Sequence, residues 1–73
     1  MSDFPRPPWS RDDRIHLASK VQGLRLRRGM SQIELAGAAD VTPATIKHIE
    51  SGMAPRPLTL KLVLVALDVP VGA

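Results

Sequence analysis

The chain has 73 residues, enough for one small domain but too few for an enzyme with separate substrate and cofactor lobes. It has no cysteine, which excludes a disulfide framework and a thiolate zinc site, and its aromatic share of 3% requires an aliphatic core. The net charge of +3 is concentrated in residues 20–61, which carry seven Lys or Arg against three Asp or Glu and therefore suit a polyanionic partner.

Residues 1–10 are expected to form a flexible, proline-rich arm, and residues 11–73 to form the domain. Three prolines in the segment 4–9 lack an amide proton and bias their predecessors toward extended geometry. The N-terminus has no hydrophobic signal-peptide core, and no apolar run approaches the ~20 residues that span a bilayer. We therefore expect a cytoplasmic protein without a membrane partner.

A long helix is expected over residues 11–28. Ser10 can cap its start, Asp12 and Asp13 lie in the first turn, where the helix dipole favours negative charge, and Gly29 can end it in left-handed geometry. Its apolar stripe consists of Leu17, Val21 and Leu24.

Two short helices are expected next, over residues 32–39 and 43–51. Ser31 and Glu34 have the spacing of a capping box, in which each side chain binds a free amide of the other residue. Thr42 followed by Pro43 is the strongest helix-start signal in the chain. Helices of this length, separated by about three residues, have the geometry of a helix-turn-helix.

A fourth helix is expected over residues 58–67, after a loop at 53–57. Its core stripe consists of Leu60, Val63, Leu64 and Leu67. A second stripe consists of Leu58, Leu62, Val65 and Val69. We interpret the second stripe as a surface for self-association; the alternative is that the arm, with Phe4 and Trp9, folds over it and keeps the chain monomeric.

The central part of the chain resembles the lambda-repressor/Cro-type helix-turn-helix family, also called the Xre family. The resemblance covers about residues 17–69 and rests on Leu24-Arg25, Arg28-Gly29-Met30-Ser31-Gln32, Glu34-Leu35-Ala36, Val41-Thr42, Thr45-Ile46 and Ile49-Glu50-Ser51-Gly52. It implies an all-α, compact bundle of four to five short helices, with helix 43–51 in the major groove of DNA. Asp40 departs from the family, which most often has Gly at this turn, but Asp tolerates left-handed geometry better than most residues.

The resemblance also implies roles for individual residues. Base-contacting positions are those of Thr42, Pro43, Ala44 and His48, of which Pro43 and Ala44 suit thymine methyl groups and His48 a polar base contact. Positions that hold the DNA backbone are those of Ser31, Gln32, Thr45, Lys47, Ser51 and Arg56. Arg25 and Glu50 match a pair that forms an internal salt bridge in this family.

The expected function is sequence-specific binding of double-stranded DNA by a transcriptional regulator, with repression by a homodimer on a palindromic operator as the first choice. The half-sites of this operator would lie about one helical turn of DNA, ~34 Å, or a multiple of that distance apart. Proteins that it resembles are encoded by bacteria, phages or mobile elements. No enzyme activity, cofactor or metal is expected, because His16 and His48 fall on different helices and because capping and ion pairing account for the carboxylates.

Two alternatives remain open from the sequence. The chain could be an antitoxin or regulatory interaction module whose main ligand is a partner protein, held by the second apolar stripe and the Trp9 arm. It could also activate transcription by touching RNA polymerase through exposed residues such as Glu34.

Overall fold

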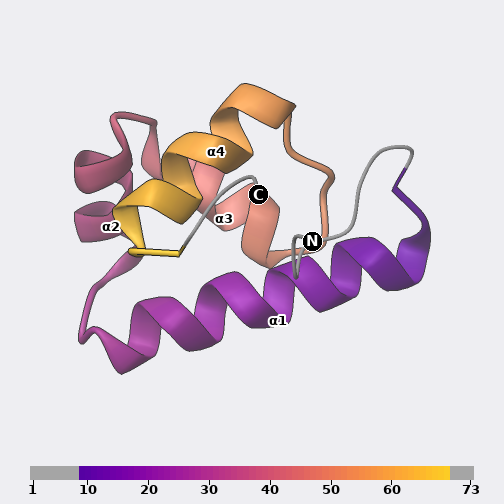
Figure 1. Ribbon diagram of the computed structural model, residues 1–73, viewed down its shortest axis with the longest axis horizontal. Helices are drawn as coiled ribbons and strands as arrows, with labels where there is room; N and C mark the ends of the chain where they lie inside the picture. The colour runs from indigo at the N-terminus through magenta and orange to yellow at the C-terminus, as the bar shows by residue number, and fades with distance from the viewer. Residues whose placement is uncertain (1–8, 70–73) are drawn as a thin grey trace.

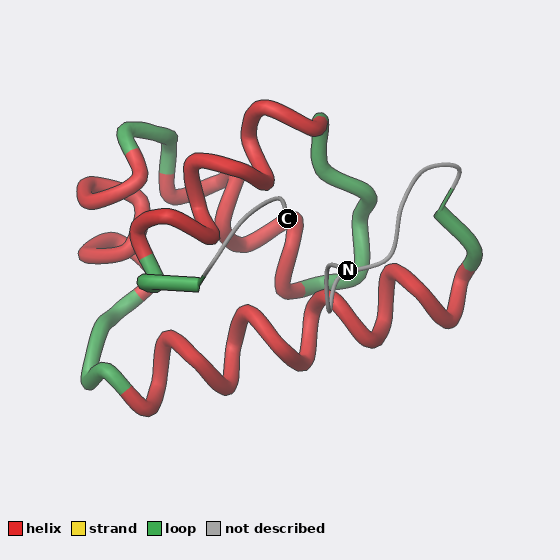
Figure 2. The backbone as a smooth tube through the Cα atoms, viewed as in Figure 1, coloured by secondary structure: helices red, strands yellow, loops and turns green. Residues whose placement is uncertain are grey.

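The computed structural model describes residues 9–69, which form four α-helices and no strand (Figures 1 and 2). The helices are α1 (Arg11–Arg27), α2 (Gln32–Ala39), α3 (Pro43–Glu50) and α4 (Pro57–Ala66). Figure 1 shows the long α1 along one side of the molecule and the three shorter helices gathered on the other side. Helix α2 packs against both α3 and α4, and α1 packs against α3. The predicted all-α class is confirmed.

The helix starts follow the capping signals in the sequence. The Ser10 hydroxyl accepts from the Asp13 amide at 3.0 Å, and the Asp13 carboxylate accepts from the Ser10 amide at 3.2 Å. Ser31 and Glu34 form the same reciprocal arrangement at the start of α2. Each pair satisfies amides that the first helical turn leaves free, so both starts are fixed locally. The second bond of the Ser10 box was not predicted.

The prediction for the start of α4 was wrong by one residue. Pro57, assigned to the preceding loop, is the first residue of the helix, and Arg56 is its N-cap. Proline suits this position because its fixed φ is helical and because the first turn has no use for its missing amide proton. The helix then ends at Ala66, one residue earlier than predicted.

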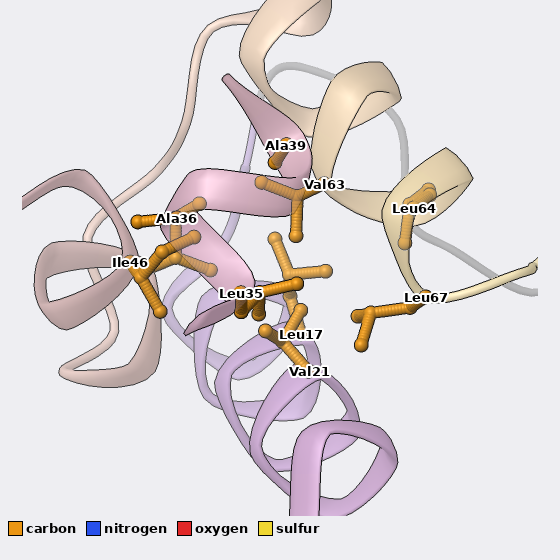
Figure 3. Packing of buried hydrophobic residues seen from close by; sticks show 10 residues of the cluster. Leu17, Val21, Leu35, Ala36, Ala39, Ile46, Val63, Leu64 and Leu67 are labelled. Atoms are coloured by element: carbon orange, nitrogen blue, oxygen red, sulfur yellow. The ribbon is translucent and has the colours of Figure 1, made fainter. Parts of the chain in front are cut away.

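The core is aliphatic, as the composition requires. It is built from Leu17 and Val21 of α1, Leu35, Ala36 and Ala39 of α2, Ile46 and Ile49 of α3, Val63 and Leu64 of α4, and Leu67, which follows α4. Figure 3 labels all of these side chains except Ile49 and shows them pointing toward one another from α1, α2, α3, α4 and the residue after α4. Because every helix contributes, the packing fixes how α2 and α3 lie relative to α1.

Residues 1–8, most of the predicted arm, and residues 70–73, the end of the chain, lie outside the described residues. Of the last two arm residues, Trp9 is partly buried and packs against the core cluster, and Ser10 caps α1.

Candidate nucleic-acid interface

The turn between α2 and α3 is made by a left-handed residue. Asp40 has φ 58° and ψ 41°, and the next amide, that of Val41, donates to the Ala36 carbonyl at 3.0 Å. Val41 is partly buried against the core, and Ala36 is 1% exposed. The tight turn and the small side chain at the helix contact bring α2 and α3 together as a helix-turn-helix.

The rotation of α3 about its axis is set by its buried residues. Ile46 and Ile49 are 0% and 2% exposed and point into the core. The other residues of α3 and its N-cap are exposed, except Thr45 and Glu50, which are partly buried. The exposed ones are Thr42, Pro43, Ala44, Lys47 and His48. All four residues assigned to base contact are therefore exposed, Thr42 as the N-cap of α3 and the other three within the helix.

The start of α3 is held by two threonines. The Thr42 hydroxyl accepts from the Thr45 amide at 3.2 Å, and the two hydroxyl oxygens lie 2.9 Å apart. The cap fixes the first turn of α3, which carries Pro43 and Ala44. A fixed first turn matters because a recognition helix presents its N-terminal residues to base edges.

The serines assigned to backbone contact differ in what they can donate. The Ser31 hydroxyl accepts from the Glu34 amide at 3.0 Å, so its own proton is not used by this bond. The Ser51 hydroxyl donates to the His48 carbonyl at 2.8 Å and cannot donate elsewhere while that bond persists. The Ser31 hydroxyl also hydrogen-bonds to the Glu34 carboxylate, whose pKa it helps to lower, so the two serines donate to different acceptors within the protein.

A hollow of about 190 Å³ lies between α3 and the loop that precedes α4. Three of the residues assigned to DNA contact lie along it, namely Thr45, His48 and Arg56. Its remaining lining comes from Ile49, Met53, Ala54, Pro55 and Thr59. Met53 and Thr59 were not expected at this site, because the sequence does not show how the loop folds back toward α3.

A buried ion pair lies behind the interface. The Arg25 Nε and Nη2 atoms donate to the two Glu50 carboxylate oxygens at 2.7 and 3.0 Å, and the side chains are 10% and 4% exposed. The hydrogen bonds to Glu50 raise the pKa of Arg25, against the opposing effect of burial. Arg25 Nη1 also donates to the Met30 carbonyl at 2.8 Å, and Gln32 Nε2 donates to Glu50 Oε1 at 3.3 Å. Neither of these two contacts was predicted.

The outer side of α4 is apolar. Leu58, Leu62 and Val65 are 68%, 38% and 56% exposed. Val69, the fourth residue of the predicted stripe, lies beyond the end of α4 and packs partly buried against the core. We refer to Leu58, Leu62 and Val65 as the outer α4 face.

Within residues 9–69, no group of three or more His, Asp or Glu side chains is placed to hold a metal ion. None of the helices described there has both the length and the apolar content that crossing a membrane requires.

The fold and this interface define a class of protein. An all-α domain in which a capped, solvent-facing second helix follows a tight turn is a helix-turn-helix domain, the architecture of DNA-binding regulators. The helix-turn-helix family model matches residues 21–73, and the chain belongs to this family, in its lambda-repressor/Cro (Xre) type. Its members are DNA-binding regulatory domains, typically without enzymatic activity. Comparison of the chain with curated proteins gives no match.

Proposed function

We propose that the chain is a homodimeric repressor that reads a palindromic operator with α3 in the major groove. The observation that carries the proposal is the solvent side of α3. It presents Thr42, Pro43, Ala44 and His48, while Ile46 anchors the helix in the core. Direct readout would come from His48 on a base edge and from Pro43 and Ala44 on thymine methyl groups.

The residues around this helix supply the backbone contacts of the proposal. Lys47 is exposed on α3, and Arg56 is exposed next to the hollow beside it. Ser31 and Gln32 lie at the start of α2, where the positive end of the helix dipole also favours a phosphate. Thr45 and Ser51 complete the set assigned to the DNA backbone. Contacts of this kind fix the register of the protein on DNA without reading sequence.

The homodimer is the part of the proposal that the outer α4 face supports. A helix that is apolar on both sides is normally buried on both sides, and here only one side faces the core. We assign the other side to a second copy of the chain, because a single recognition helix contacts few base pairs and two half-sites need two copies. In a two-fold contact the same face serves both copies.

Fluorescence anisotropy tests DNA reading directly, with duplexes that tile the DNA upstream of the gene, a scrambled duplex and several salt concentrations. We expect one tile to bind tightly, to lose affinity steeply with salt and to saturate at two chains per duplex. Lys47→Glu and Arg56→Glu should each lower the affinity about tenfold or more. Arg11→Glu, the same charge change at the start of α1, is the matched control.

The outer α4 face also favours a second candidate, an interaction module whose main ligand is a partner protein. The two candidates respond differently to the charge reversals. If Lys47→Glu and Arg56→Glu leave binding to the best tile unchanged, α3 does not read DNA and the first proposal is wrong. If these variants instead release a co-purified protein while Arg11→Glu does not, the second candidate replaces it.

A further inference from the structure

The Glu50 carboxylate binds two partners on two different helices. Its Oε2 atom accepts from Arg25 Nε at 2.7 Å, and its Oε1 atom accepts from both Arg25 Nη2 at 3.0 Å and Gln32 Nε2 at 3.3 Å. Glu50 is the last residue of α3, and Gln32 is the first residue of α2. One buried side chain therefore ties the end of the recognition helix to the start of the helix before it.

This contact settles which way the Gln32 amide faces. A carboxylate can only accept hydrogen bonds, so the NH₂ group of Gln32, and not its carbonyl oxygen, must point at Glu50. One amide hydrogen is then used by Glu50, and the second hydrogen and the carbonyl oxygen are left for a ligand. A phosphate oxygen needs a donor, which the second hydrogen supplies.

We propose that Glu50 is a positioning residue for DNA binding: it holds the Gln32 amide with a hydrogen directed at a DNA phosphate. The inference rests on the proposed backbone contact of Gln32. Because Arg25 neutralises Glu50, the carboxylate orients Gln32 without adding net negative charge beside the DNA. Arg25 also donates to the Met30 carbonyl at 2.8 Å, two residues before Gln32, so a third hydrogen bond holds the guanidinium in place.

Holding the side chain in advance increases affinity, because binding no longer has to freeze a mobile glutamine. The ordering of one such side chain is worth about two- to tenfold in affinity, and a hydrogen bond to a charged group about tenfold or more. We therefore expect Gln32→Ala to weaken duplex binding about tenfold. Glu50→Gln leaves one acceptor oxygen for Arg25 and Gln32 to share, and we expect it to weaken binding through Gln32 by about two- to tenfold.

Side-chain NMR tests the positioning in the protein without DNA. The chain has two glutamines, Gln22 and Gln32, and no asparagine, so only two NH₂ signal pairs are expected in the amide region. Gln22 is exposed on α1 and is the internal control. We expect the NH₂ group of Gln32 to show restricted fast motion and that of Gln22 to be mobile. Equal mobility of the two groups overturns the proposal.

A double-mutant cycle then separates positioning from a purely structural role. Binding of the wild type, Glu50→Gln, Gln32→Ala and the double variant is measured on the tightest tile or, if all tiles bind alike, on a random-sequence duplex. Urea unfolding of each variant confirms that it is folded at the assay temperature. If Glu50 acts through Gln32, the loss caused by Glu50→Gln disappears when Gln32 is already alanine.

The outcomes distinguish this proposal from the proposed function. An equal loss from Glu50→Gln in both backgrounds means that Glu50 acts only through the fold, and the inference is wrong. If Gln32→Ala binds like the wild type while Lys47→Glu does not, Gln32 makes no contact and the inference is wrong, although α3 still reads DNA. If neither variant changes binding, the proposed function fails as well.

Discussion

Removal of the Glu50 carboxylate should be the most damaging single truncation outside the apolar core. In Glu50→Ala, Arg25 keeps its bond to the Met30 carbonyl but loses the acceptors of Nε and Nη2, at a site where its side chain is 10% exposed. Breaking a buried pair in this way costs about 3–5 kcal/mol. A domain of 73 residues is stable by about 4–11 kcal/mol in total, so the variant should lose at least about a quarter of the free energy of unfolding.

The loss is measured by urea unfolding at one protomer concentration, followed by far-UV circular dichroism and by the fluorescence of Trp9, the only tryptophan. Asp68→Asn is the control, because Asp68 forms an exposed ion pair with Arg28 at 3.8 Å, and such pairs are worth at most about 1 kcal/mol. If Glu50→Ala costs no more than Asp68→Asn, the pair behaves as a solvated one and the reasoning from burial is wrong.

Three further predictions concern the surface and the helix ends. Leu62→Asp should convert the proposed dimer into a monomer, as measured by size-exclusion chromatography with light scattering. The control Gln22→Glu, on α1, should leave the dimer intact. A dimer that survives Leu62→Asp contradicts the role of the outer α4 face in self-association. Hydrogen bonds from Ser31 lower the pKa of Glu34. The stabilisation that these bonds give the folded state is therefore present above the ordinary glutamate pKa of about 4.3 and is lost as the pH falls below that value. Glu34→Gln should flatten the pH dependence of the free energy of unfolding in this range, and an unchanged pH dependence contradicts the prediction. Asp40→Gly should raise the free energy of unfolding by about 0.5–1 kcal/mol, because φ is 58° there, and a fall in the thermal midpoint would speak against strain at the turn.

The helices could be predicted closely because their signals are local. Ser31 with Glu34, and Thr42 with Pro43, are read from neighbouring residues, and the structure uses both. Pro57 was misassigned because proline fits both a loop and the first position of a helix, and the choice depends on where the loop places it. Local patterns therefore predict which segments are helical and where a capped helix begins, whereas the first residue of α4, which has no side-chain cap, could not be read from them.

The outer α4 face shows where a periodic pattern stops being valid. The predicted stripe extended helical spacing to Val69, two residues beyond the predicted end of the helix, but the chain reverses at Asp68, with φ 62°. The Val69 amide then donates to the Leu64 carbonyl at 2.9 Å, the bond of a left-handed helix cap. This reversal directs Val69 toward the core, so helical spacing describes Leu58, Leu62 and Val65 but no longer Val69.

Contacts between α2 and the end of α3 had no signal in the sequence. Gln32 and Glu50 are 18 residues apart, and whether they meet depends on the angle at which the two helices cross. The Arg25–Glu50 pair was expected through the family resemblance alone, since a spacing of 25 residues predicts no contact. The candidate DNA-contacting residues could be named in the same way, but their hydrogen-bonding capacity, such as the engaged Ser51 hydroxyl, required coordinates.

A buried ion pair is a poor source of stability, because well-packed apolar side chains of similar size often do as well or better. Arg25→Leu combined with Glu50→Leu should therefore recover at least half of the stability that Glu50→Ala loses. The same double variant removes the acceptor that holds Gln32 and should bind the duplex about as weakly as Gln32→Ala does. A double variant that is stable and still binds like the wild type would mean that the pair serves the fold alone. A double variant that is stable but binds the duplex weakly would mean that the Arg25–Glu50 pair acts by positioning the Gln32 amide for DNA binding.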